Sequence, residues 1–265
     1  MNSLALTPAA SGAAARQPRV LAAYLAELHG ELLRTMRNPG LAIPILIMPV
    51  ALYVLIALVV AGEAVDKDPL LGVYLFGAFG IMGVTMPALF AIGAGLALDR
   101  EMGLLRLKRA QPAPVGAWLV AKIVAGILFG MIAYLPMLAV AVWSGKLSLG
   151  APALVGMSFA LLAGSIPFCA LGLMVGSLVK GAAAPGYANL IYLPGCYLSG
   201  MFFPLPKSMH WQAPFWPQFH VEQVAMHAAG ATKFQFMPLQ MCVAALVGFT
   251  VLFGAVAFWK LSRKG

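Results

Sequence analysis

The most constraining feature of this sequence is a set of six long stretches without a charged residue. They separate Arg37 from Glu63, Asp68 from Asp99, Lys122 from Lys146, Lys146 from Lys180, Lys180 from Lys207, and Lys233 from Lys260. A helix needs roughly 20 apolar residues to cross the hydrocarbon core of a bilayer. Only 9% of the residues are charged, which excludes an ordinary soluble domain. We expect an all-α, polytopic membrane protein with six transmembrane helices, at about residues 41–62, 70–98, 118–142, 152–178, 185–203 and 238–259.

The N-terminal region divides into two parts. Residues 1–18 are rich in alanine and show no periodicity, so we expect a disordered tail. From residue 19 to 37 apolar side chains recur at helical spacing, which predicts an amphipathic helix on the membrane surface. A solvated helix of a small cytosolic extension is the alternative. Residues 38–265 would then form one transmembrane domain.

The basic residues predict the orientation of the chain. Of 17 lysines and arginines, four lie on one side of the membrane, namely Lys67, Lys146, Lys207 and Lys233, and the other 13 lie on the opposite side. Because basic connections stay in the cytoplasm, we expect a multi-pass protein of the cell (inner) membrane with both termini cytoplasmic. Membrane lipids with anionic headgroups are sufficient partners for the net charge of +9, so nucleic acid is not needed.

Motifs for catalysis or cofactor binding are missing from the sequence. There is no GxxxxGK[ST] phosphate loop, no HExxH pair and no CxxC pair. We therefore expect no enzyme, no cofactor in this chain and no metal site. One alternative stays open, because His210, His220 and Glu222 could serve a membrane enzyme that acts on lipid.

Small residues predict where helices pack closely. The second predicted span contains six glycines, so we expect it to be buried against other helices. GxxxG spacings occur in the third span, at Gly126 and Gly130, and in the fourth, at Gly172 and Gly176.

The connection over residues 99–118 is basic, and leucines alternate with its basic residues before two prolines end the predicted helix. Such a helix is suited to docking in a groove of a soluble protein, and equally to lying on lipid phosphates. Lys122 follows near the start of the third span, where we expect its ammonium group to reach the membrane interface.

Three motifs give a family resemblance. They are R-x-x-R-N-P at residues 34–39, D-R-E-x-G-x-L at 99–105, and L-P-G-x-x-L-S-G-x-F-F-P-L at 193–205. In this order they resemble the permease subunits of ABC-2 type transporters, the membrane halves of ATP-binding-cassette exporters. The resemblance implies a six-helix protomer that pairs with a second permease protomer as a homo- or heterodimer. It also implies two copies of a separate ATP-binding subunit, which would bind ATP and magnesium.

The resemblance further implies roles for segments of this chain. Residues 19–37 would be the connecting helix, residues 204–230 the outer re-entrant helices, and spans 2 and 5 the lining of the two-fold axis and export path. The coupling contact with the ATP-binding subunit would be made by Asp99, Arg100, Glu101, Gly103, Leu104, Arg106, Lys108 and Arg109. The pathway and outer gate would include Asn189, Tyr192, Ser199, Gly200, Phe203, Pro204 and Pro206. For the polar groups of span 5, hydrogen bonding between helices is an equal alternative.

The expected function is export of a hydrophobic or amphipathic molecule, such as a drug, a lipid or a lipid-linked glycan. Besides the lipid-modifying enzyme, a haem-handling subunit of cytochrome maturation is an alternative, and it would show a haem spectrum on purification.

Overall fold

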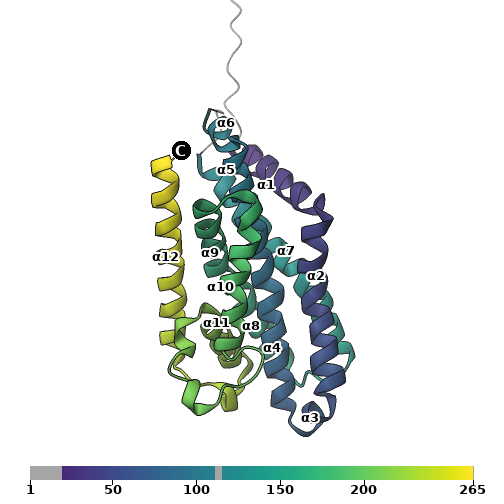
Figure 1. The fold of residues 1–265 in the computed structure, drawn as a ribbon. Helices are drawn as coiled ribbons and strands as arrows, with labels where there is room; N and C mark the ends of the chain where they lie inside the picture. Colours follow the sequence, from purple (N-terminus) through teal and green to yellow (C-terminus); the bar gives the residue numbers. More distant parts are fainter. Residues whose placement is uncertain (1–19, 111–114, 265) are drawn as a thin grey trace, which may run out of the picture.

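A computed structural model describes residues 20–110 and 115–264, and all regular structure in these ranges is helical (Figure 1). The expected all-α class is confirmed. The predicted tail, residues 1–18, lies outside the described residues. Figure 1 shows an elongated bundle with α1, α6 and the C-terminus at one end, called the α6 end, and α3 and α11 at the other, called the α11 end.

Five helices are long and apolar enough to cross a membrane, and they match predicted spans 1 to 4 and 6. They cover Ala42–Val60, Pro69–Glu101, Gly116–Trp143, Ala151–Leu178 and Leu239–Arg263. In order they consist of α2 (Pro39–Tyr53) with η1 (Val54–Val60), α4 (Pro69–Met86) with η2 (Pro87–Ala91) and α5 (Ile92–Glu101), α7 (Val115–Trp143), α8 (Ala151–Ala163) with α9 (Ser165–Leu178), and α12 (Leu239–Lys264).

The predicted fifth span corresponds to a shorter helix. α10 (Ala184–Leu198) has 15 residues, which at 1.5 Å per residue reach about 22 Å, less than the hydrocarbon core of about 30 Å. The helix stops before residue 203 because Gly200 adopts a left-handed φ of 80° and two prolines follow. α10 packs against α5, η2 and α9. A sixth complete crossing therefore stays a prediction.

The remaining elements precede or connect the long helices. At the α6 end these are α1 (Val20–Met36), α6 (Leu104–Ala110) and η3 (Gly181–Ala183). At the α11 end they are α3 (Gly62–Lys67), η4 (Lys207–Met209), η5 (Ala213–Phe215), α11 (Pro217–Ala229) and η6 (Thr232–Phe234). α11 packs against α4, α8 and α12. Whether it enters the membrane as a re-entrant helix stays a prediction.

The continuous helix formed by α4, η2 and α5 lies at the centre of the bundle. Every residue from Gly72 to Met86 is buried. Pro87 has no N–H to donate, and at this residue the helix widens into the π-helical η2. The predicted burial of the second span is confirmed.

Both GxxxG motifs pack against this central helix. A Cβ added to Gly130 of α7 would lie 3.1 Å from the Cα of Val84. On the opposite side, a Cβ added to Gly172 of α9 would lie 2.8 Å from the carbonyl oxygen of Leu89. The predicted close packing of these helices is confirmed, because only glycine allows such an approach of two backbones.

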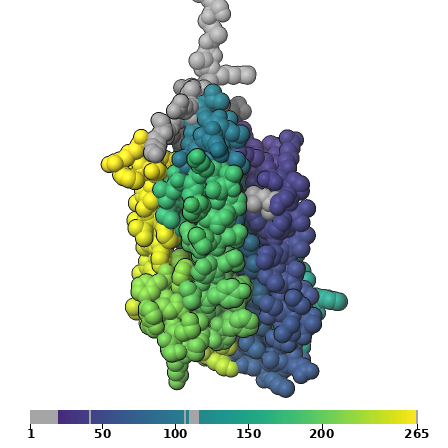
Figure 2. Space-filling model, in the orientation of Figure 1, coloured from purple at the N-terminus to yellow at the C-terminus, as the bar shows by residue number. Residues whose placement is uncertain are grey.

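Burial of the central helix bears on the expectation that spans 2 and 5 both line a two-fold axis. α4 is enclosed within the protomer, so it offers no free face to a second copy in this arrangement. α10, in contrast, lies on the surface, as Figure 2 shows. Of the two helices, only α10 is placed where a second protomer could reach it.

α1 presents an unusual pattern for a helix at a protein surface. Its apolar side chains Leu21, Leu25 and Met36 are exposed, whereas Glu31 on its inner face is buried. An exposed apolar face with a buried acid agrees with contact to lipid on one side and to a polar cluster on the other. Its position on a membrane surface stays a prediction.

Candidate functional site

Four charged side chains, here called the Asp99 cluster, meet at the α6 end where α1, α5 and α7 converge. Nζ of Lys122 lies 2.9 Å from Oδ2 of Asp99 and 2.8 Å from Oε2 of Glu31. Arg34 forms a second ion pair with Asp99. Asp99 is fully buried and Lys122 is 2% exposed. Two acids and two bases balance in charge, which is how buried ions are tolerated in a medium of low polarity.

This arrangement corrects one expectation. The ammonium group of Lys122 does not reach out to the membrane interface, because Glu31 and Asp99 pair with it inside the protein. No sequence pattern indicates this pairing, since 91 residues separate Glu31 from Lys122 and only the packing of α1 on α7 brings them together.

Other residues of the expected coupling set hold the α6 end together. Nη1 of Arg100 donates to the carbonyl oxygen of Gly176 at 2.7 Å, near the end of α9. Oε2 of Glu101 accepts from the backbone N–H of Gly181 at 3.1 Å, at the start of η3. Lys108 of α6 pairs with Glu27 of α1. These side chains therefore hold α5 against the end of α9 and the start of η3, and α6 against α1, within the same protomer.

The turn between α5 and α6 and the α6 helix expose apolar side chains. Gly103 adopts a left-handed φ of 71°, which turns the chain between α5 and α6. Met102 and Leu107 are exposed at 57% and 62%, and Leu104 is half-buried. The side chains of the two remaining residues of the expected coupling set, Arg106 and Arg109, lie outside the described residues.

A polar cavity of about 630 Å³ lies beside this exposed apolar part. It separates the end of α5 from the turn between α9 and η3 and from the last turns of α12. Its charged lining residues are Arg100, Glu101, Lys180 and Lys260.

The polar residues of α10 point in different directions. The hydroxyls of Tyr192 and Thr85 are hydrogen bonded at 2.8 Å, and the Tyr192 ring contacts Phe90 and Phe168 edge to face. Tyr192 is thus buried between helices, which is the alternative use considered for it. Asn189 lies on the exposed face of α10. The two residues do not form one surface within the protomer.

The segment after α10 turns at Gly200. Tyr74 of α4 donates a hydrogen bond from its hydroxyl to the carbonyl oxygen of Gly200. The Oγ of Ser199 accepts from the backbone N–H of Met201 at 3.3 Å. Three further residues of the expected gate are exposed, namely Phe203, Pro204 and Pro206.

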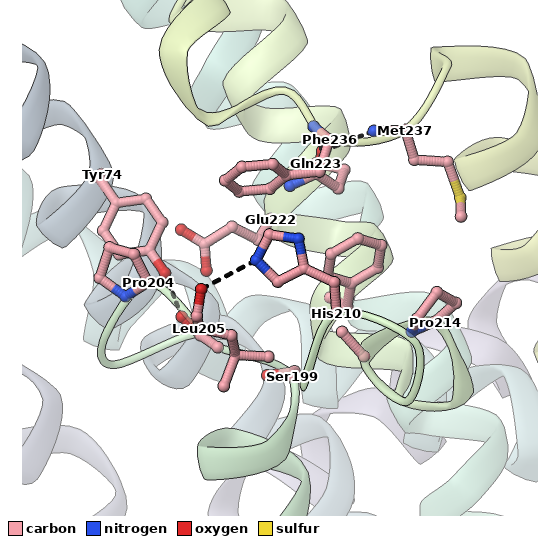
Figure 3. A pocket seen from close by; sticks show the side chains of 13 residues that line it. Tyr74, Ser199, Pro204, Leu205, His210, Pro214, Glu222, Gln223, Phe236 and Met237 are labelled. Carbon is pink, nitrogen blue, oxygen red and sulfur yellow. Dashed lines mark hydrogen bonds between the residues drawn. The ribbon is translucent and has the colours of Figure 1, made fainter. Parts of the chain in front are cut away.

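A small cavity, here called the Glu222 pocket, lies directly beneath this turn (Figure 3). Its volume is about 110 Å³. Ser199, Gly200 and Pro204 line it, so the structure brings together three of the expected gate residues. Tyr74, His210, Glu222 and Gln223 are its other polar lining residues.

Glu222 is the most unusual group in this pocket. It is 3% exposed, and neither carboxylate oxygen has a hydrogen-bond partner among the described residues. It lies on α11, outside the five long apolar helices. Burial raises the pKa of its carboxyl well above the usual range. The sequence contained one sign of its isolation, because Glu222 is the only acidic residue after Glu101.

The three groups considered for a lipid-modifying enzyme are not assembled. His210 and Glu222 share the pocket, but His220 is not part of its lining. The Nε2 of His220 lies 2.9 Å from the carbonyl oxygen of Pro214, and its ring packs against Phe249 of α12. Within residues 20–110 and 115–264, no three His, Cys, Asp or Glu side chains are grouped to hold a metal ion.

Comparison with known proteins agrees with this architecture. The family model for the ABC-2 type transporter matches residues 23–228. The chain is also 24% identical over 195 residues to a protein of Bacillus subtilis (strain 168) named "Putative transport permease YvfS". That match covers 72% of this chain and 78% of the Bacillus protein. Because the family model spans more than half of its residues, this chain belongs to the ABC-2 type transporter family of membrane permeases.

Proposed function

We propose that this chain is the transmembrane permease subunit of an ABC exporter. It would form the substrate pathway and couple that pathway to ATP hydrolysis in a separate nucleotide-binding subunit. Two permease protomers, identical or different, would bind two copies of that subunit, which would hold ATP and magnesium. The α6 end would face the cytoplasm from the cell (inner) membrane, and both termini would be cytoplasmic.

The main support is the continuity of the central helix between the two ends of the bundle. Its 33 residues span about 50 Å at 1.5 Å per residue. One end holds Asp99, which is anchored to α1 and α7 by ion pairs. The other holds Tyr74, whose hydroxyl contacts Gly200 beside the Glu222 pocket. A displacement of α6 would thus be transmitted along one continuous helix to the expected outer gate.

The exposed face of α10 supports a site for the second protomer and the substrate. Tyr187, Leu190, Leu193 and Tyr197 are exposed at helical spacing on a helix that is buried on its other side. Such an uncharged, partly aromatic face agrees with a hydrophobic or amphipathic substrate passing between two protomers.

The contact with the ATP-binding subunit can be tested at the exposed apolar residues of the α6 end. Leu107→Glu places a charge on this surface without touching the Asp99 cluster. We expect it to reduce, at least tenfold, the amount of phosphate-loop ATPase that co-purifies with the tagged chain from its native membranes. Met209→Glu, on a residue 37% exposed at the α11 end, is the matched control. Co-purification that Leu107→Glu leaves unchanged would remove this surface from the proposal.

A further inference from the structure

The Glu222 pocket contains a carboxylate without a counter-ion. None of the residues that line it is a lysine or an arginine. Its two other titratable side chains are Tyr74 from α4 and His210 from the segment after η4. The one nearby cation of η6, Lys233, pairs with Asp68 instead. A negative charge on Glu222 is therefore uncompensated by any described residue.

The carboxylate of Glu222 lies against Gly77 of α4, where the methyl groups of Met157 and Met226 also pack. A Cβ added to Gly77 of α4 would lie 3.6 Å from Oε1 of Glu222. Figure 3 shows the carboxyl group between the rings of Tyr74 and His210. A buried acid without partners destabilises a fold relative to an apolar residue of similar size. Its presence is explained if a ligand supplies the missing charge.

The other lining groups indicate which cation fits. The rings of Tyr74, Phe219 and Phe236 surround the cavity, and aromatic faces attract organic cations. Ser199 Oγ and the carbonyl oxygens of Gly200 and Leu205 each accept one hydrogen bond, from the Met201 N–H, Tyr74 and His210 respectively, and an oxygen with two lone pairs can accept a second bond. A calcium ion would need six to eight oxygen ligands, usually with several carboxylates, and Glu222 is the one carboxylate in this lining.

We propose that the Glu222 pocket binds the ammonium group of an organic amine, with the Glu222 carboxylate as its counter-ion. Ser199, Gly200 and Leu205 would accept hydrogen bonds from the ammonium group, and the aromatic rings would surround its carbon atoms. The proposal of an amine as ligand does not depend on the export function. Resting on that function, it further assigns an amine-bearing amphipathic molecule as the exported substrate.

Binding should depend on pH in a defined direction. Burial raises the pKa of Glu222 above its usual range when the pocket is empty, which favours the protonated form of the group. A bound ammonium group favours the ionised form, so binding displaces a proton. Below the pKa of the empty pocket, the affinity for the amine should rise as pH rises, by up to tenfold per pH unit.

The test uses the full chain in lipid nanodiscs without its ATP-binding partner, with ethanolamine as the probe and isothermal titration calorimetry as the measurement. We expect binding that strengthens from pH 6 to pH 8 and that releases close to one proton per amine in the acidic part of this range. Glu222→Gln should weaken binding at least tenfold at pH 8. Glu63→Gln, which changes an exposed acid at the same end of the bundle, is the matched control and should bind as the unmodified chain does.

Three outcomes would overturn the assignment. The first is an affinity of Glu222→Gln for ethanolamine that equals that of the unmodified chain, and the second is the absence of proton release in the unmodified chain. The third is displacement of ethanolamine by sodium chloride at the same concentration, which would indicate a site for an inorganic cation. Proton release is measured without any substitution, so it remains informative if a variant fails to fold. If the chain binds the amine but shows no ATP-dependent transport, the export function alone is contradicted. If it transports but does not bind the amine, the assignment of the pocket alone is contradicted.

Discussion

Replacing Lys122 by methionine tests the Asp99 cluster most directly. Methionine keeps much of the volume of the side chain and removes its charge, so the packing change is small. The substitution leaves Asp99 paired with Arg34 but leaves Glu31 without its partner, and the buried cluster changes from neutral to a net charge of −1. Breaking a buried ion pair in this way costs about 3–5 kcal/mol.

The effect is measured as the change in the free energy of unfolding of the purified chain in detergent. Lys146→Met provides the matched control, because Lys146 forms an ion pair with Asp66 at the α11 end, where the Asp66 side chain is 62% exposed. An exposed pair of this kind contributes about 0–1 kcal/mol. We therefore expect Lys122→Met to destabilise the chain by several times as much as Lys146→Met.

A double substitution separates charge from packing. Glu31→Gln together with Lys122→Met leaves only the neutral pair of Arg34 and Asp99 in the cluster. We expect the double variant to lose about 0.5–3 kcal/mol less than the sum of the two single losses, which is the range for directly interacting residues. Equal losses for Lys122→Met and Lys146→Met, or strictly additive losses in the double variant, would refute the anchoring of α5 by this cluster.

Two further predictions concern the central helix and α11. Gly176→Ala should destabilise the chain by about 1–3 kcal/mol, because its Cβ would lie 2.6 Å from the carbonyl oxygen of Gly93. Gly248→Ala in α12 meets no atom within 4 Å and should be neutral or slightly stabilising in the same unfolding assay. Without an amine, Glu222→Gln should stabilise the chain, and by more at pH 8 than at pH 5. The raised pKa of Glu222 means that the folded chain holds a proton that the unfolded chain releases, so the penalty grows above the usual pKa of a glutamate. A stabilisation independent of pH would contradict this reasoning.

Much of the architecture follows from the sequence by itself. Uncharged stretches predict the long helices because the bilayer tolerates few charges, and five of the six predicted spans appear as helices of sufficient length. The glycine-rich second span and the two GxxxG motifs predict the central helix and its neighbours, since close approach of backbones needs residues without side chains. These are local properties, readable from composition and spacing.

The functional sites depend on contacts between distant residues, and only the tertiary structure decides these. The sequence predicts Lys122 at the membrane interface, but in the structure α1 packs on α7 and places Glu31 beside it. Glu222 and Tyr74 lie far apart in the chain, and the packing of α11 on α4 brings them into one pocket. Charge pairing acts through space, and no periodicity in the sequence records which helices meet. The sequence therefore determined the membrane-spanning framework, whereas the tertiary structure decided which of its few charges are paired and left Glu222 buried without a hydrogen-bond partner among the described residues.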